Sequence, residues 1–125
     1  MHAERWCALK QKDPAESLLR DARIGLMALM VLKLLVSHGP LHGYAVMKHI
    51  EELLGETPPK STIYDALKRL EKLGLVDSYW ARGPEGTVRK YYQAKSDASH
   101  VLEKVLRSLC SLIMPILRDA DCMTG

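Results

Sequence analysis

The sequence contains little cysteine, and its cysteines are not spaced for cross-linking. Cys7, Cys110 and Cys122 are odd in number and form no C-x-x-C pair, which argues against a disulfide framework and a cysteine-based zinc site. The histidines offer no metal site either, because Gly39-Pro40 interrupts the one pair that is four residues apart. We therefore expect no metal, and a location in the reducing cytoplasm.

A membrane-spanning run and the usual catalytic motifs are also missing. The longest apolar stretch, Ile24 to Val36, contains Lys33 and is shorter than the roughly 18 to 20 residues that a membrane crossing needs. The polar opening MHAERWCALKQKDP does not resemble a secretory signal. Because no glycine-rich phosphate loop, nucleophile–base pair or carboxylate cluster is present, we expect neither an enzyme nor a bound cofactor.

The composition that remains is that of one globular domain. The chain has 125 residues, of which 47% are hydrophobic and 26% are charged. The formal net charge is +3, a mild basic excess that permits an anionic partner without requiring one. The position of the positive charges is therefore more informative than their sum.

An apolar helix is predicted near the start of the chain. It runs from about Ser17 to His38, where a Gly-Pro sequence is typical of a helix end. Its central part is apolar nearly all round and needs cover on two sides; we expect a second copy of the chain to supply one of them. Residues 1–15 are predicted to form an arm, in which Trp6 is expected to dock on another surface.

Two shorter helices follow. The first covers His42 to Leu54, with apolar residues at spacings of three and four, and is ended by Gly55. The second follows the rigid connector TPPK, takes Ser61 or Thr62 as its N-cap and ends at Gly74.

The remaining sequence predicts a hairpin and a long helix. LVDSYWA and TVRKYYQA are rich in β-branched and aromatic residues, and they flank the turn sequence RGPEG. The long helix begins at Ser96 and continues to about Met114, where Pro115 bends or ends it. Its leucines and isoleucines recur at spacings of four and three, which suits packing against a partner helix. Cys110, on this helix, is expected to be buried.

The order helix, helix, helix, strand, strand, helix is that of a winged helix-turn-helix, a mainly α fold with a β-hairpin. We divide the chain into an arm (1–15), a winged helix-turn-helix domain (16–95), and a C-terminal dimerisation helix with its tail (96–125).

The helix over residues 60–74 has two unlike faces. Its apolar residues form one continuous stripe on a helical wheel and must face the core. The opposite side carries Ser61, Asp65, Lys68 and Lys72, flanked by Thr62, Tyr64 and Arg69. Between Lys60 and Lys72 there are four basic and two acidic residues. The alternative to a recognition surface is an ordinary solvated face with an Asp65–Arg69 pair.

The hairpin carries further positive charge. Near its turn, Arg82, Arg89 and Lys90 stand against Glu85, so residues 60–72 and 82–90 together contribute +4, more than the +3 of the whole chain. Hydroxyl side chains at the start of the helix are suited to base edges and phosphates. This concentration of charge favours a surface for double-stranded DNA.

Three stretches resemble the PadR family of transcriptional regulators: LLVSHGPLHGYAVMKHIEE, STIYDALKRLEKLGLVDSYW and VRKYYQA. The resemblance covers about Ile24 to Ala94, with the three motifs in order. The short chain with one C-terminal helix is similar to the family's short subgroup. Ala94-Lys95 stands where the family usually has Leu-Thr.

The resemblance implies a homodimer formed by the N-terminal and C-terminal helices, and repression of nearby genes. It also implies that Tyr64 and its neighbours enter the major groove, with His42 and Tyr44 near the phosphates. Some short members bind planar aromatic drugs through a tryptophan of the last helix; this helix has none, so that ligand class is not implied.

We predict a homodimer that reads a pseudo-palindromic operator through helix 60–74 and wing 76–94. The candidate DNA-binding residues are His42, Tyr44, Lys60, Ser61, Thr62, Tyr64, Lys68, Arg69, Lys72, Arg82, Arg89 and Lys90. The candidate dimer-interface residues are Ile24, Met27, Val31, Leu102, Leu106, Leu109, Ile113 and Ile116.

Some residues admit two interpretations. Tyr91 and Tyr92 point to opposite sheet faces, and the alternation does not say which is buried. Trp80 is expected to pack within the hairpin. The methionines Met27, Met30 and Met114 suit either an ordinary core or a small-molecule effector pocket.

The rival function is a winged-helix module that binds protein instead of DNA. A neutral or apolar outward face on helix 60–74 would favour it, and the basic residues of that face argue against it.

Overall fold

The computed structural model describes residues 13–120. In that part of the chain the elements are α2 (Pro14–His38), β1 (Leu41–His42), α3 (Gly43–Leu54), α4 (Lys60–Lys72), β2 (Val76–Arg82), β3 (Val88–Ala94) and α5 (Ala98–Ala120). The predicted winged helix-turn-helix class is confirmed, with one strand more than expected. Trp6 lies outside the described residues, so its predicted docking stays a prediction.

Helix α2 starts earlier than expected. The Asp13 carboxylate caps it by accepting the amide protons of Ala15 and Glu16 at 3.1 and 3.4 Å, and Pro14 occupies the first turn, where its missing N–H costs nothing. The last residues of the predicted arm are therefore helical. The helix ends as predicted at Gly39, whose φ of 84° is a conformation that favours glycine.

Helices α3 and α4 have unusual first turns. The imidazole of His42 caps α3, accepting the Ala45 amide proton at 3.2 Å. Helix α4 begins at Lys60 directly after Pro59, and no side chain caps it. The predicted Ser61 or Thr62 cap is therefore wrong: the fixed φ of Pro59 (−61°), with an extended ψ of 141°, already sets the chain for helix entry.

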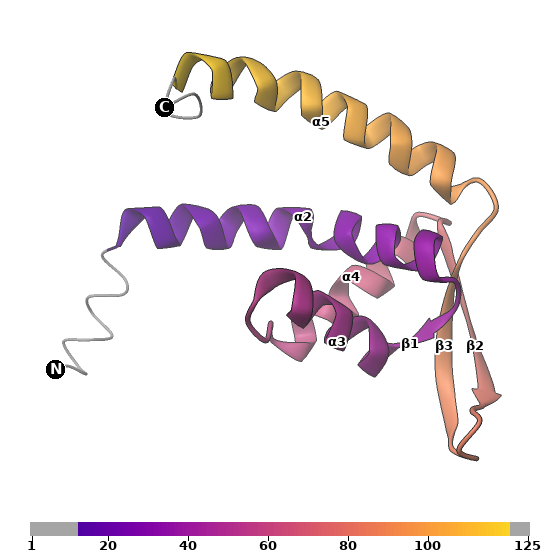
Figure 1. The fold of residues 1–125 in the computed structure, drawn as a ribbon. Helices are drawn as coiled ribbons and strands as arrows, with labels where there is room; N and C mark the ends of the chain where they lie inside the picture. The colour runs from indigo at the N-terminus through magenta and orange to yellow at the C-terminus, as the bar shows by residue number, and fades with distance from the viewer. Residues whose placement is uncertain (1–12, 121–125) are drawn as a thin grey trace, which may run out of the picture.

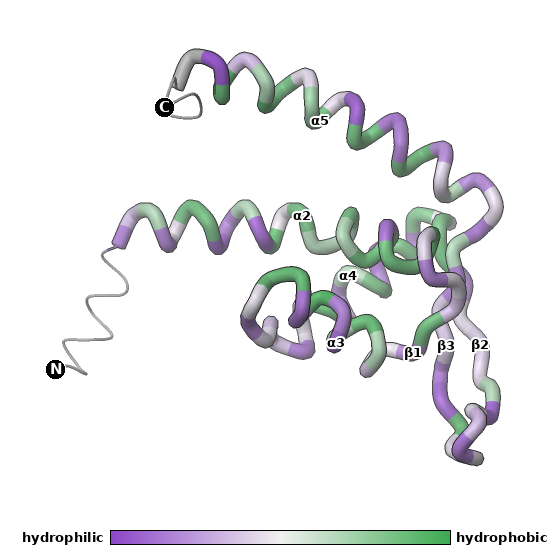
Figure 2. The backbone as a smooth tube through the Cα atoms, viewed as in Figure 1, coloured by the Kyte–Doolittle hydropathy of each residue, from purple (hydrophilic) through white to green (hydrophobic). Residues whose placement is uncertain are grey.

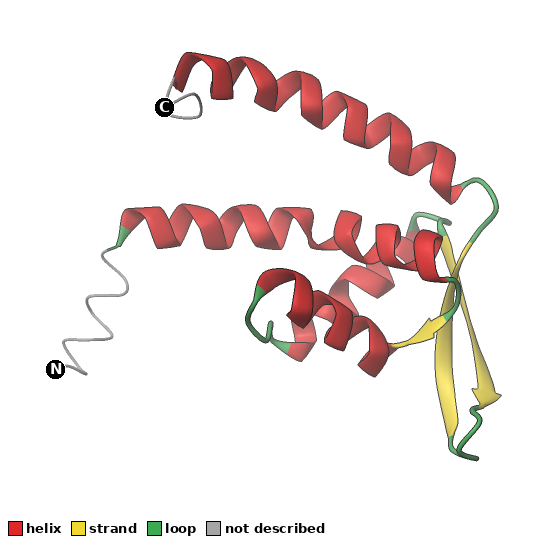
Figure 3. Cartoon of the chain, in the orientation of Figure 1, coloured by secondary structure: helices red, strands yellow, loops and turns green. Residues whose placement is uncertain are grey.

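The sheet has three antiparallel strands in the order β1-β3-β2 (Figure 3). The hairpin of β2 and β3 was predicted, whereas β1 was not, because two residues cannot show a strand period. Leu41 pairs with Tyr92, and His42 pairs with Tyr91. This short strand ties the start of α3 to the wing strands.

The core lies where α2, α3, α4 and the sheet meet. Its most buried side chains are Leu32, Leu35, Ile50, Ile63, Leu67, Val31, Val46 and Val76. The predicted stripe of α4 is confirmed for Ile63, Ala66, Leu67 and Leu70, whereas Leu73 is 57% exposed. Tyr92 is the buried member of its tyrosine pair.

The two long helices extend beyond this core. In Figure 1, α5 returns along α2, and the two pack against each other near the sheet. Helix α5 begins at Ala98, not Ser96, and continues through Pro115 to Ala120, so the proline does not end it. Cys110 is exposed, so its predicted burial is wrong. None of the described helices has an apolar stretch long enough to cross a membrane.

Leu67→Ala tests the burial of the α4 stripe. Leu67 is fully buried, so its truncation should lower the free energy of unfolding by about 2–5 kcal/mol. Leu73→Ala, just past the end of the same helix, is the matched control and should cost about 1 kcal/mol or less. Urea unfolding followed by circular dichroism at one protein concentration measures both. Equal losses would contradict the orientation of α4.

Candidate nucleic-acid interface

Helix α4 presents a hydrophilic face opposite its buried stripe. The exposed residues of this face are Lys60, Ser61, Tyr64, Asp65, Lys68, Arg69 and Lys72, and Thr62 is half-buried. Tyr64, 38% exposed, lies on the flank that faces the start of α3. The side that a groove would meet is thus polar and cationic along the whole helix.

The starts of α3 and α4 meet the wing around one hollow. It has a volume of about 350 Å³ and is lined by His42, Gly43, Tyr44, Tyr64, Trp80, Arg89, Lys90 and Tyr92. We call it the elbow hollow. Five of the candidate DNA-binding residues, drawn from β1, α3, α4 and β3, line it: His42, Tyr44, Tyr64, Arg89 and Lys90.

Gly43 allows Tyr64 to lie at this place. A Cβ atom on Gly43 would be 2.7 Å from both Cε1 and Cζ of the Tyr64 ring, and closer still to its hydroxyl oxygen. Because carbon atoms need more than 3 Å of separation, any larger residue would displace the ring. The sequence analysis did not single out Gly43; its place between His42 and Tyr44 was the available signal.

His42 is held as a neutral ring. Its Nδ1 accepts the Ala45 amide proton and so cannot itself carry a proton. The ring meets the edge of Tyr91 at 5.5 Å between centroids and lies parallel to Tyr44 at 6.4 Å. Burial lowers the pKa of His42, and the positive charge of Arg89 lowers it further, against a smaller opposing effect of Glu85.

The wing tip is braced by its own hydrogen bonds. Arg82 donates to the carbonyl of Gly86 at 2.7 Å, and Gly86 itself has a φ of 94°. Arg89 Nε lies 3.3 Å from a carboxylate oxygen of Glu85. Lys90 Nζ lies 5.7 Å from the centre of the Tyr92 ring. Within residues 13–120 neither Arg82 nor Lys90 has a carboxylate partner, and Lys90 has no hydrogen-bond partner on the wing either.

The four candidate cations of α4 form no ion pair within residues 13–120. In the described part of the chain, ion pairs join Arg23–Glu56, Lys48–Glu51, Arg89–Glu85, Lys95–Asp77 and Arg107–Glu103. Lys60, Lys68, Arg69 and Lys72 are in none of these pairs, so the Asp65–Arg69 pair of the alternative interpretation does not form. Cations on α4 are left without internal partners, so their charge is available to an anion from outside the chain.

The comparison with protein families agrees with this geometry. The sequence pattern of the Transcriptional regulator PadR-like family matches residues 31–103. That range covers α3, α4 and the whole sheet, more than half of the chain. The chain belongs to the PadR-like family. Its members are transcriptional regulators, not enzymes. No curated protein matches the sequence.

Solved structures of transcriptional regulators share the fold. A PadR family regulator from Eggerthella lenta is 27% identical, with a TM-score of 0.75, over 91% of this chain and 98% of that one. A transcriptional regulator from Clostridium thermocellum is 26% identical, with a TM-score of 0.67, over 79% and 93%. PadR of Bacillus subtilis, solved in complex with operator DNA, is 25% identical, with a TM-score of 0.55, over 65% and 46%.

Not every candidate residue of this PadR-like chain joins the elbow hollow. Arg69 and Lys72 lie in the last turn of α4, where cations also stabilise the helix dipole. Arg69 is about 140° around the helix from Tyr64. Trp80 was expected to pack within the hairpin, but its side chain is 69% exposed, so that prediction is wrong. The described residues contain no cluster of three metal ligands.

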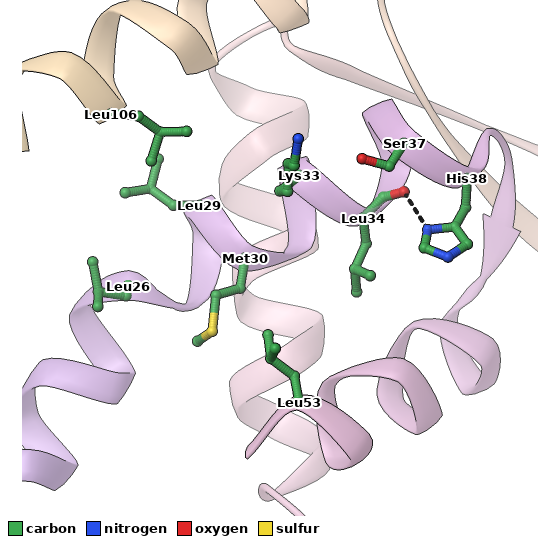
Figure 4. A pocket seen from close by; sticks show the side chains of 9 residues that line it. All are labelled: Leu26, Leu29, Met30, Lys33, Leu34, Ser37, His38, Leu53 and Leu106. Atoms are coloured by element: carbon green, nitrogen blue, oxygen red, sulfur yellow. Dashed lines mark hydrogen bonds between the residues drawn. The ribbon is translucent and has the colours of Figure 1, made fainter.

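A second, apolar cavity lies between α2, α3 and α5 (Figure 4). Its volume is about 460 Å³, and its lining includes Leu26, Met30, Lys33, Leu53 and Leu106. At one end His38 Nδ1 lies 3.2 Å from the carbonyl oxygen of Leu34. Of the methionines considered for an effector pocket, Met30 lines this cavity, whereas Met27 is buried in the core.

His42 predicts a pH dependence of stability. Its pKa is lower in the folded chain than the ordinary value of 6.5, so the neutral ring stabilises the fold fully above about pH 6.5. That stabilisation should be lost as the pH falls through the folded pKa. His42→Asn keeps an oxygen that can cap α3 and does not titrate.

We therefore expect the unfolding free energy of the wild type, measured with urea between about pH 5 and 8, to fall more steeply on acidification than that of His42→Asn. Parallel curves would mean that His42 contributes nothing to the pH dependence.

Proposed function

We propose that this protein is a DNA-binding transcriptional regulator that recognises a duplex through α4 and the wing formed by β2 and β3. The single observation that carries the proposal is that the unpaired lysines of α4, Lys60, Lys68 and Lys72, lie within about 80° of Tyr64 around the helix, and Tyr64 lines the elbow hollow. The complex of Bacillus subtilis PadR with operator DNA supports it.

The two kinds of side chain on this surface suit two roles. Ser61, Thr62, Tyr64 and Arg69 are proposed for base edges in the major groove, since short hydroxyls and aromatic or guanidinium groups reach them. The residues proposed for phosphates are Lys60, Lys68, Lys72, Arg82, Arg89 and Lys90. His42 and Tyr44, at the start of α3, are proposed to lie near the same DNA phosphates.

The exposed apolar faces of the long helices support a homodimer. Beyond the core, α2 exposes Leu18, Leu19, Ile24 and Leu26, and α5 exposes Leu106, Leu112, Ile113, Met114 and Ile116. Figure 2 shows hydrophobic segments recurring along both helices. A surface of this kind is rare on a soluble monomer. A second copy packed here would bury it.

The proposed interface differs in part from the sequence prediction. Ile24, Leu106, Ile113 and Ile116 are exposed, and Leu109 is half-buried, so all five are retained. Met27, Val31 and Leu102 are 3%, 0% and 4% exposed within a single chain. They pack in the chain's own core, so the proposed dimer contacts exclude them.

Dimerisation through the long helices determines the form of the proposed operator. Two copies related by a two-fold axis would place their α4 helices in successive major grooves, about 34–36 Å apart on a pseudo-palindrome. Bound there, the protein would repress transcription by occupying the promoter. The apolar cavity beside Leu26 and Leu106 would adjoin the partner chain, and a small apolar effector held in it could alter that spacing.

The direct test is binding to DNA fragments from the neighbourhood of the protein's own gene, followed by footprinting. We expect protection of a two-fold symmetric site. Tyr64→Ala should then weaken binding to that site by about 5- to 150-fold, because a lost base contact costs about 1–3 kcal/mol. Its affinity for random duplex should change by less than about twofold. Equal losses on both duplexes would contradict base reading by Tyr64.

Ile113→Asp tests the proposed dimer. Ile113 is 42% exposed on α5, and a carboxylate buried in an apolar interface should raise the dimer dissociation constant by roughly 30-fold or more. Leu73→Asp, at an exposed position of similar size just after α4, is the matched control and should leave it unchanged. Sedimentation equilibrium measures both. A monomeric wild type, or an undisturbed Ile113→Asp dimer, would contradict the interface.

A further inference from the structure

Trp80 is a large apolar side chain left in solvent on the wing. It stands opposite Lys90 in the β2–β3 register, and directly opposed residues share one face of a sheet. Closer to the core, the same face carries the buried Val76 and Tyr92. At Trp80 the helices no longer cover this face, and the indole is 69% exposed.

The exposed indole is part of a built concave surface. Trp80 and Lys90 line the wing side of the elbow hollow, while Tyr44 and Tyr64 line its helix side. Aromatic rings from both sides thus surround a space of about 350 Å³, which Arg89 and Lys90 also line. The hollow is continuous with the cationic face of α4 through Tyr64, which belongs to both.

The occupant that fits this lining is the backbone of a bound duplex. A deoxyribose has an apolar face that can cover an indole, and the phosphate next to it is an anion that an ammonium can pair with. An α4 helix in the major groove and a wing beside the groove must have a backbone strand between them, and the elbow hollow lies between those two elements.

We propose that Trp80 and Lys90 form a sugar–phosphate clamp: the indole packs on one deoxyribose and the Lys90 ammonium pairs with the adjoining phosphate. This clamp rests on the DNA-binding function proposed above and adds to it a contact that is independent of base sequence. Trp80 contributes apolar contact and an N–H donor, whereas Lys90 contributes charge.

The salt dependence of binding should distinguish the contribution of Trp80 from that of Lys90. Trp80→Ala should weaken binding by about five- to twentyfold on the footprinted fragment and on a scrambled fragment alike, because a backbone contact carries no base information. Since no charge is removed, the slope of log K against log salt should stay that of the wild type. Lys90→Ala should also weaken both, and should flatten the slope by about one.

Tyr79→Ala is the matched control. Tyr79 is the neighbouring aromatic residue on β2, 40% exposed, but it lies on the opposite sheet face, where it stacks with Tyr91 at 5.9 Å. Its loss should change the affinity by less than about twofold. Trp80→Phe should recover most of the binding that Trp80→Ala loses, because a ring can still cover the sugar.

Fluorescence gives a readout that does not depend on affinity. Trp80 is one of two tryptophans, so the difference between wild type and Trp80→Phe belongs to Trp80. We expect saturating duplex to shift this difference emission to shorter wavelength, because the indole leaves water.

The outcomes distinguish the clamp from the function on which it rests. A wild type that binds no duplex overturns both. A wild type that binds, with Trp80→Ala behaving like Tyr79→Ala or with unchanged Trp80 emission, overturns the clamp alone. A loss confined to the footprinted fragment would make Trp80 a base reader and also overturn the clamp.

Discussion

The burial of one stripe of α4 is the constraint on which the rest of the surface depends. Ile63 and Leu67 are fully buried and Leu70 nearly so, which fixes the rotation of the helix about its axis. The cations of α4 are thereby turned outward, into solvent. Because packing sets this orientation, the charged residues of α4 lie outside the core.

The same helix is held to the wing and to α3 by specific contacts. The Ser78 hydroxyl donates to the Glu71 carboxylate at 2.6 Å, which joins β2 to α4. The missing side chain of Gly43 lets the Tyr64 ring lie against α3. Strand β1 pairs His42 with Tyr91 and so joins the start of α3 to β3. These links hold together the elements that line the elbow hollow.

Much of this was predictable from the sequence because it follows a local period or a strong turn signal. The stripe of α4, the turn RGPEG and the glycines that end α2 and α3 are of this kind. The cap of α4 was not predictable: Ser61 and Thr62 satisfy the usual preference, but Pro59 already fixes the entry into the helix. Strand β1 has two residues and therefore no period to detect.

The remaining differences between prediction and structure concern which apolar residues are buried by neighbouring elements. That burial depends on the tertiary structure and not on the local sequence. Strand alternation places Trp80 on the core face of the sheet without saying how far the helices extend over it. Cys110 has an apolar neighbourhood in sequence but is exposed. Met27, Val31 and Leu102 look like other apolar residues of the long helices, and only the packing within one chain separates them from Ile24 and Ile113.

Amide hydrogen exchange of the full chain, with and without saturating duplex, tests the central claim most directly. The account predicts slower exchange in two segments, the first turns of α4 and the strands around Trp80 and Lys90, with the exposed half of α5 unchanged. Slower exchange confined to α2 and α5, with none at α4 or the wing, would contradict it.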